Sequence, residues 1–497
     1  MERALSKRLR FIPVWVLVLV ALACAAAAGA APMRPMLETS AFTPLAGASV
    51  PCLNGGIPCY QPFELQAAYN FPTGTGAPTG AGQTIVVVTA YGAPFVHDDI
   101  ETFGMLTGVP VPPNLTVYTQ QTAVPSATEG SGQTYFWQVE TDLDAQWAYA
   151  MAPQAHIVVA VANSDDPRDM AQVMREVLPQ YPRAIVTQSF GMNETDLASI
   201  PGLPASAFSS MYLDVVRGGG TVVAASGDLG ASNGTELDGS QPSAMAAYPA
   251  SDPLVLAVGG TEGNPYPDGL LTDVGTYGGE QTWNEISPTG MPGASGGAPS
   301  TIFDAPPWQR SLHTKSRLEP DVSYNAALVD GTLVILSCRP NRDDGGMTLD
   351  PSCVDSSRQG YVSVGGTSAG APQWAAIVAL TNQVRASQVR APLGLVAPVL
   401  YELARDRIAY ARDFHDVTAG GNALDLTSVG FPAPSQFVFT AGPGYDLPTG
   451  LGTPNVANLL GDLVTREPGE IPGNVARGIR SGNGNGNGRP HRFDPSK

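Results

Sequence analysis

Histidine, cysteine and positive charge are all scarce in this sequence, and each scarcity narrows the range of functions. The 497 residues include five histidines, five cysteines and 26 Lys plus Arg against 44 Asp plus Glu. The formal net charge is −18 and the pI is near 4.6. A protein this negative at neutral pH would be repelled by nucleic-acid phosphates, so we expect no nucleic-acid partner. Because 43% of the residues are hydrophobic and only 14% are charged, the chain can bury a large globular core.

The N-terminus combines basic residues with an apolar run. Basic residues between positions 3 and 10 precede the apolar run over 11–28, and small residues follow at Ala30 and Ala31. This order predicts a signal peptide over residues 1–31, and therefore a secreted, extracellular protein without stable membrane association after cleavage. An uncleaved membrane anchor is the alternative because the run approaches spanning length, and lipidation of Cys24 is a minor option.

Four cysteines remain once the signal peptide is removed, an even number that suits an oxidising compartment. Cys52 is close in sequence to Cys59, and Cys338 is close to Cys353. Of the three possible connectivities we favour the two local bridges, Cys52–Cys59 and Cys338–Cys353.

Short β-branched runs alternate with longer amphipathic stretches through most of the chain. This alternation predicts an α/β domain over residues 60–464, with a largely parallel sheet flanked by helices on both faces and ligands at the carboxyl ends of its strands. A short lead-in, residues 32–59, precedes the domain, and a Gly/Asn-rich tail over 465–497 has too few apolar residues to fold. Strands are expected at 84–90, 156–161, 184–188, 221–225 and 254–258, and helices at 99–106, 135–149, 168–178, 207–216 and 369–383.

Ser368 lies where a strand-like run meets a helical stretch, in GGTSAGAP at residues 365–372. Glycines permit a tight backbone turn there, and the start of a helix favours developing negative charge. Ser368 is therefore a candidate nucleophile, although a serine in this position can equally serve as a helix cap.

A serine hydroxyl needs a base to become a nucleophile, and histidine is the usual one. Of the five histidines, His97 in PFVHDDI is the only one early enough in the chain to be considered. Its setting does not resemble the histidine motif of subtilisin-like enzymes, and the first expected strand does not deliver an aspartate. The sequence therefore disfavours a histidine-dependent triad.

Carboxylates offer another base. Glu140 and Asp144 are four residues apart, so they share one face of the expected helix, beside Phe136 and near Trp147. An apolar setting raises the pKa of a carboxyl group and lets two carboxyls share a proton, which allows one of them to act as a general base. A solvated pair on an exposed helix is the alternative reading, and Asp142, on another face, is expected to be solvated.

Asp228 follows a buried strand and a Ser-Gly turn in TVVAASGDLGASNG. Acyl transfer needs a hydrogen-bond donor aimed at the oxyanion, and an aspartate can donate only when it is protonated. Asp228 in this role would work best in acid. The alternative is an aspartate that only helps to form the turn.

Six stretches together resemble the sedolisin family of serine-carboxyl peptidases, which have a subtilisin-like fold and acid-active chemistry. In the family order, and spanning most of residues 60–464, they are ETDLD (140–144), SFGMNE (189–194), SGDLG (226–230), YPASDPLVLAVGGT (248–261), PDVSYNA (320–326) and GGTSAGAP (365–372). The combination of GGTSAGAP, a Glu-x-x-x-Asp pair and SGD is specific, whereas no single one of them is.

The resemblance implies a role for each candidate residue. Ser368 matches the nucleophile, Glu140 the general base, Asp144 the carboxyl that orients this base, and Asp228 the protonated oxyanion donor. It implies an endopeptidase or tripeptidyl-peptidase that acts on protein or peptide substrates at acidic pH, and we expect a monomer. Two alternatives stay open: a catalytically inactive, calcium-stabilised binding protein of the same fold, and a histidine-dependent subtilisin-type peptidase.

The resemblance also implies one structural Ca²⁺ ion near the C-terminus. Its ligands would be the carboxylates of Asp416 and Asp446 with main-chain oxygens of Val417, Gly442 and Gly444. Calcium takes six or more hard oxygens, and the segments DFHDVT and AGPGYDLPTGLGTP are dense in turns and carbonyls. A metal-free cluster of turns is the alternative.

The sequence departs from the family in one respect. Family members usually carry a long inhibitory pro-segment, whereas PFELQAAYN, similar to the start of a family catalytic domain, comes soon after the expected signal peptide. Either the enzyme matures without a long pro-segment or the pro-segment has been lost, so inhibition during export needs another source. A cytoplasm at neutral pH, in which Asp228 loses its proton, is one hypothesis.

Overall fold

The computed structural model describes residues 31–45, 59–124, 133–200, 202–237, 243–266, 277–287, 290–343, 346–350, 352–431, 434–473 and 475–476. Residues 1–30 of the expected signal peptide, Cys52, and most of the expected tail lie outside the described residues.

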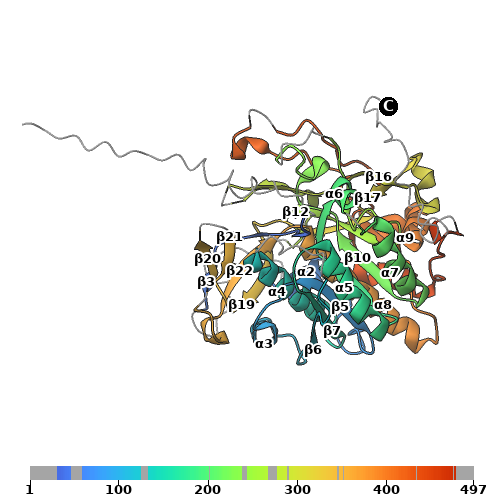
Figure 1. Ribbon diagram of the computed structural model, residues 1–497. Helices are drawn as coiled ribbons and strands as arrows, with labels where there is room; N and C mark the ends of the chain where they lie inside the picture. The colour runs from blue at the N-terminus through green and yellow to red at the C-terminus, as the bar shows by residue number, and fades with distance from the viewer. Residues whose placement is uncertain are drawn as a thin grey trace, which may run out of the picture.

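An eight-stranded sheet forms the centre of the molecule (Figure 1). Its strands pair in parallel except for the strand at 280–282, which is antiparallel to its neighbour. The α/β prediction is therefore confirmed. In spatial order the strands are β13 (Glu280–Thr282), β12 (Leu256–Gly263), β10 (Thr221–Ala225), β8 (Ile185–Gln188), β5 (Thr84–Ala90), β7 (His156–Ala162) and β6 (Asn114–Thr119), with β18 (Val322–Asn325) also paired with β12.

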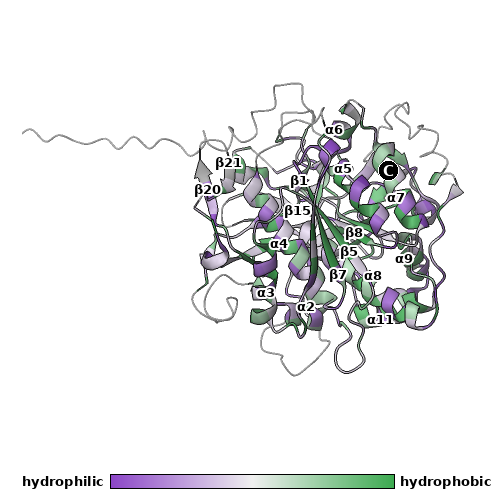
Figure 2. Ribbon diagram, turned by 60° about the horizontal axis from the view of Figure 1, so that its bottom comes forward, coloured by the Kyte–Doolittle hydropathy of each residue, from purple (hydrophilic) through white to green (hydrophobic). Residues whose placement is uncertain are grey.

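Both faces of this sheet are buried. Successive side chains of a strand point to opposite faces, so Ile85 and Val87 of β5 join one hydrophobic cluster while Val86 and Val88 join another. The first cluster includes α4 (Thr134–Met151) and α8 (Gly370–Ser387), and the second includes α5 (Pro167–Val177) and α7 (Ala205–Arg217). Figure 2 shows the hydrophobic central strands between these helices. Burial on both faces explains the continuous apolar runs in the sequence.

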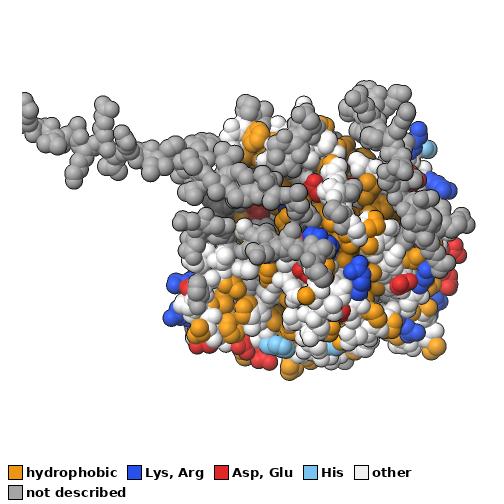
Figure 3. Space-filling view, in the orientation of Figure 1, with side chains coloured by type: hydrophobic (Ala, Val, Ile, Leu, Met, Phe, Trp, Pro, Cys, Tyr) orange, Lys and Arg blue, Asp and Glu red, His pale blue; other side chains and the backbone are white. Residues whose placement is uncertain are grey.

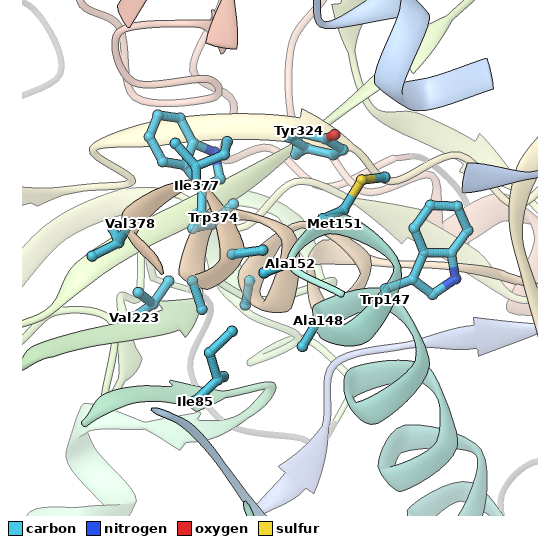
Figure 4. Close-up of a cluster of buried hydrophobic side chains, with 14 of the residues drawn as sticks. Ile85, Trp147, Ala148, Met151, Ala152, Val223, Tyr324, Trp374, Ile377 and Val378 are labelled. Atoms are coloured by element: carbon cyan, nitrogen blue, oxygen red, sulfur yellow. The ribbon is translucent and has the colours of Figure 1, made fainter. Parts of the chain in front are cut away.

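Helices α4 and α8 both contribute buried side chains to the first hydrophobic cluster. In Figure 4, Trp374 and Ile377 of α8 and Ala148 of α4 lie close to Ile85 and Val223 of the sheet. All of these side chains are buried, and packing at this density fixes the two helices against each other and against the strands. Helix α4, which carries Glu140, and helix α8, which begins two residues after Ser368, therefore rest on a rigid base.

The ends of several helices follow from local chemistry. Helix α5 begins after Asp166, whose side chain accepts a hydrogen bond from the amide of Arg168, and Pro167 occupies its first turn. Helix α3 (Val96–Thr107) ends at Gly108, which adopts the left-handed conformation that glycine tolerates best.

A second sheet covers the side of α4 that faces away from the central sheet. Its strands are β2 (Glu38–Thr39), β22 (Gly360–Gly365), β19 (Gly331–Leu336) and β4 (Cys59–Tyr60), with β3 (Thr43–Pro44) paired with β22. The indole nitrogen of Trp147 donates to the carbonyl of Leu333 at 2.9 Å. Gln146 donates to the carbonyl of Ile335 at 2.6 Å and accepts from its amide at 3.0 Å. Helix α4 therefore lies between two sheets.

The expectation that Asp142 is solvated is wrong. Its side chain is 0% exposed because the second sheet covers this face of α4. The face would lie in water if α4 packed only against the central sheet. Burial and the charge of Asp99 raise the pKa of Asp142 well above its usual value.

One of the two expected disulfides lies within the described residues. Cys338 and Cys353 are bonded, with their Cα atoms 5.6 Å apart, as the sequence predicted. The bridge spans the hairpin of β20 (Pro340–Asp343) and β21 (Gly346–Leu349). Cys59 is disulfide-bonded, and its expected partner Cys52 lies outside the described residues.

The ends of the described chain are attached to the domain. In the lead-in, β1 (Arg34–Pro35) pairs with β9 (Phe190–Asn193). Near the C-terminus, Gly469 pairs with Gly394 and Leu395, beyond the boundary expected at 464. Among the described residues, none of the helices is both long and apolar enough to span a bilayer. On the face shown in Figure 3, the basic side chains of the described residues are scattered among acidic and neutral ones.

Candidate active site

Ser368 lies at the junction of a strand and a helix. Strand β22 ends at Gly365, a short turn η6 (Thr367–Ala369) carries Ser368, and α8 follows directly. Gly366 in this junction has a φ of 111°, and a Cβ there would lie 2.5 Å from Oδ2 of Asp228. Only glycine fits this conformation and this approach, so the GGTS sequence brings Ser368 and Asp228 together.

The hydroxyl of Ser368 faces Glu140. Its Oγ lies 2.9 Å from Glu140 Oε2, to which it donates, and 3.1 Å from the carbonyl oxygen of Ser189. Both side chains are buried, with Glu140 only 1% exposed. Among the described residues no histidine hydrogen-bonds to Ser368, and His97 lies exposed on α3. The serine and the carboxylate are 228 residues apart in sequence and meet through packing of α4 against α8.

Asp144 lies one helical turn beyond Glu140 on the same face of α4. Its Oδ1 accepts a hydrogen bond from the Ser189 hydroxyl at 2.6 Å. Burial raises the pKa of Asp144 to about 8, and burial together with the nearby Asp144 carboxyl raises the pKa of Glu140 well above its usual value. The other oxygens, Glu140 Oε1 and Asp144 Oδ2, have no partner among the described residues. A proton shared between the two carboxyls would reduce both the repulsion between their negative charges and the cost of burying those charges.

Asp228 approaches Ser368 from the carboxyl end of β10. Its Oδ1 accepts hydrogen bonds from the amide and the hydroxyl of Thr367, at 2.9 and 2.7 Å. Its Oδ2 is buried without a partner among the described residues. Burial raises the pKa of Asp228 to about 7, against the opposing effect of the Thr367 hydrogen bonds and of Arg34. Below that pH, Oδ2 carries a proton and can donate to an oxyanion.

The structure thus brings Ser368, Glu140, Asp144 and Asp228 into one buried cluster, and it adds a residue that the sequence analysis missed. Ser189 contacts Asp144 through its hydroxyl and Ser368 through its carbonyl oxygen. It follows the carboxyl end of β8, where ligands of a parallel sheet gather, so its position in the SFGMNE stretch was a signal for it.

The expected calcium ligands lie together in two loops. Asp416 accepts hydrogen bonds from the amide of Gly444 at 3.1 and 3.0 Å, and Asp446 accepts from the amide of Gly442 at 2.8 Å. Burial and then the Asp416 charge raise the pKa of Asp446 to about 6, against the loop hydrogen bonds. The described residues hold no group of three or more His, Cys, Asp or Glu that could bind a metal. Two neighbouring carboxylates among loop carbonyls nonetheless fit the oxygen chemistry of Ca²⁺.

The chain is similar in sequence to known peptidases. The model of the subtilase family matches residues 139–393, a range that contains all four clustered residues. Kumamolisin of Bacillus sp. (strain MN-32) is 32% identical over 422 residues, which cover 82% of this chain and 64% of that protein. Sedolisin of Pseudomonas sp. (strain 101) is 26% identical over 439 residues, covering 86% of this chain and 64% of that protein. The chain therefore spans about two thirds of the length of these relatives.

A solved structure shares the fold. Pseudomonas sedolisin, described as a serine-carboxyl proteinase complexed with two molecules of pseudo-iodotyrostatin, matches with a TM-score of 0.62 and 24% identity. The match covers 82% of this chain and 98% of that one. The predicted subtilisin-like fold is therefore confirmed.

Proposed function

We propose that this chain, which belongs to the subtilase family and within it to the sedolisins, is a serine-carboxyl peptidase that hydrolyses protein or peptide substrates in acid. The observation that carries the proposal is the 2.9 Å hydrogen bond from Ser368 Oγ to Glu140 in a buried site. A serine that is hydrogen-bonded to a base, which is itself coupled to a second acid, has the arrangement of an activated nucleophile.

The proposed reaction is acyl transfer. Glu140 takes the proton of Ser368 while the hydroxyl oxygen attacks the substrate carbonyl, and the same proton then passes to the leaving amine. The amide of Ser368 and the protonated Asp228 stabilise the oxyanion. Water enters with Glu140 again as the base, and the acyl group leaves Ser368 as a carboxylic acid.

The acid preference follows from Asp228. With a pKa of about 7, its donor proton is lost as the pH rises through neutrality, so the oxyanion loses one of its two donors. At lower pH Asp228 is neutral, so the oxyanion keeps both of its hydrogen-bond donors. We therefore expect activity to fall from acid toward alkaline pH.

Hydrolysis of a peptide library from acid to mildly alkaline pH tests this function. Ser368→Ala and Glu140→Gln should each lose activity by roughly 10²–10⁴-fold or more, because one removes the nucleophile and the other the base. Glu101→Gln, on the exposed face of α3, is the matched control and should retain wild-type activity.

Two other outcomes would refute this function. An alkaline optimum together with inactivity of His97→Ala would identify a histidine-dependent peptidase. Absence of hydrolysis at every pH, with peptides still bound by the protein, would identify an inactive binding protein of the same fold.

Secretion, a monomeric state and a structural calcium ion complete the proposal. The predicted signal peptide and the Cys338–Cys353 disulfide support export to an oxidising compartment. Asp416 and Asp446 would hold Ca²⁺ with the main-chain oxygens of Val417, Gly442 and Gly444, after the present amide contacts rearrange. The ion would supply positive charge between two carboxylates and stabilise the loops that carry them.

A further inference from the structure

Thr367 lies directly before the nucleophile and faces Asp228. It belongs to the turn η6, and its side chain is 0% exposed. Its amide donates to Asp228 Oδ1 at 2.9 Å, and its hydroxyl donates to the same oxygen at 2.7 Å. Two donors of one residue therefore converge on one oxygen of a carboxyl group that lies 139 residues away in sequence.

The direction of the Thr367 hydroxyl is fixed by its second partner. Its Oγ1 accepts a hydrogen bond from the amide of Gly227 at 3.2 Å. A backbone amide can only donate, so the hydroxyl is the acceptor in this bond and its own proton is left for Asp228 Oδ1. Because Gly227 directly precedes Asp228, Thr367 holds both the backbone that leads into Asp228 and the carboxyl group of that residue.

The two oxygens of the Asp228 carboxyl therefore differ. Oδ1 accepts two hydrogen bonds from Thr367, whereas Oδ2 has no partner among the described residues. A neutral carboxylic acid carries one proton, and an oxygen that already accepts two hydrogen bonds has less room for it. Thr367 thus directs the proton to Oδ2, which would lie 2.5 Å from a Cβ at Gly366, in the junction that carries Ser368.

Replacing Thr367 with another uncharged residue would leave the charges around Asp228 unchanged. The titratable groups that interact with Asp228 include Glu140 of α4, Glu38 of β2 and Arg34 of β1. Burial raises the pKa of both glutamates, so both can be neutral in acid. A change in the titration of Asp228 after such a replacement would therefore report the lost hydrogen bond.

We propose that Thr367 is a positioning residue of this peptidase, whose hydroxyl holds the Asp228 carboxyl so that the proton lies on Oδ2 and points toward the oxyanion. The inference rests on the proposed function and adds a residue that acts through Asp228. Thr367 then has two opposite effects. It places the donor of the neutral acid, and by hydrogen bonding to the ionised form it also lowers the pH at which the donor proton is lost.

Thr367→Val tests both effects, because it removes the hydroxyl and keeps the amide and the shape of the side chain. The donor acts on the transition state, so kcat in acid should fall by roughly tenfold or more while KM changes little. The Thr367 hydrogen bonds oppose the raised pKa of Asp228, so losing one should move the alkaline limb of the kcat/KM profile to higher pH by about one unit. The ratio of variant to wild-type kcat/KM should therefore rise with pH.

Further variants separate the hydroxyl from the rest of the side chain. Thr367→Ser keeps the hydroxyl and should retain the rate and the alkaline limb of the wild type, whereas Thr367→Ala lacks it and should show the same shift as the valine variant. Thr381→Val is the matched control and should behave like the wild type, because Thr381 is also buried and its hydroxyl donates to the carbonyl of Ile377 within α8. In Asp228→Asn the titrating group is absent, so adding Thr367→Val should not move the alkaline limb.

Unfolding supplies a measurement that does not need activity. In a Ser368→Ala background, Thr367→Val should raise the folded pKa of Asp228 further above its unfolded value. A raised folded pKa contributes stability that is fully present below the unfolded pKa and is lost as the pH rises through the folded pKa. The variant should therefore lose more unfolding free energy between pH 4 and pH 9 than its parent does. Urea unfolding measures this difference, with Thr381→Val in the same background as the control.

The outcomes separate this inference from the function on which it rests. A fall in the activity of Thr367→Val without movement of the alkaline limb, or the same movement in Thr381→Val or in the Asp228→Asn background, would overturn the inference while peptide hydrolysis stood. If the wild type hydrolyses no peptide at any pH, the proposed function is refuted and unfolding decides the inference. A difference between Thr367→Val and its parent that is equal at pH 4 and pH 9 would then overturn it, and a difference that grows with pH would support the hold of Thr367 on Asp228.

Discussion

Replacing Asp228 with asparagine should change how stability depends on pH. In the folded protein the pKa of Asp228 is raised from 3.8 to about 7, chiefly by burial. A carboxyl whose folded pKa is raised contributes stability that is fully present below the unfolded pKa and is lost as the pH rises through the folded pKa. Since one unit is worth about 1.36 kcal/mol, Asp228 should cost the wild type up to about 4 kcal/mol between pH 4 and pH 8.

Asparagine removes this titration while keeping the shape of the neutral acid. Its carbonyl oxygen can accept from Thr367 as Oδ1 does, and its amide can occupy the position of the protonated Oδ2. The unfolding free energies of Asp228→Asn and the wild type should therefore be similar at pH 4. At pH 8 the variant should be more stable by up to about 4 kcal/mol.

Urea unfolding at several pH values measures this difference. Both proteins should carry Ser368→Ala, which prevents digestion by the enzyme during the measurement. Asp304→Asn, at an exposed position at the end of β16 (Ala298–Asp304), is the matched control and should show a difference that does not vary with pH. A difference between Asp228→Asn and its parent that stays constant from pH 4 to pH 8 would refute the assigned burial of this carboxyl.

Two further predictions concern acids outside the catalytic cluster. Asp142→Asn should leave the unfolding free energy nearly unchanged at pH 4 and raise it by on the order of 1–3 kcal/mol at pH 8. The reason is that a buried carboxyl with a raised pKa must otherwise stay protonated or bear an unpaired charge. Urea unfolding at both pH values checks this. Calcium at about 100 times its Kd should raise the unfolding free energy by about 2.7 kcal/mol, which calorimetry can measure. A chelator should reverse this gain. The gain should be lost in Asp416→Asn and Asp446→Asn but kept in Asp304→Asn. A calcium response unchanged by both substitutions would remove these residues from the ligand set.

The central sheet could be predicted because its signal is local. Strands β5 and β10 begin and end where the sequence placed them, since a buried parallel strand requires a short apolar run of β-branched residues. The expected helix at 135–149 extends from Thr134 to Met151, an error typical of helix ends, where the apolar pattern fades. The positions of these elements are set by residues that are close together in the sequence, which is why the sequence alone predicts them.

The second sheet could not be predicted in this way. Its lead-in strands are two residues long, too short for any periodicity to appear, and they pair with β22 across more than 300 residues of sequence. Without that sheet, Asp142 appeared to face water. The same limit applies to the site. The apolar stripe on α4 indicated an unusual acid pair, but only the resemblance connected Glu140 to Ser368. Nothing local indicated that Met36 would lie against Ser368.

Occupation of the Ser368 site and protonation of Asp228 are linked. Met36 and Leu37 lie against Gly366, beside the Asp228 carboxyl. Burial is the main cause that raises the pKa of Asp228, so a bound peptide excludes water and favours the protonated acid. An empty cleft admits water and lets Asp228 ionise more easily. By linkage, acid favours occupation of the site, and it also protonates Asp228, the group that would donate to an oxyanion.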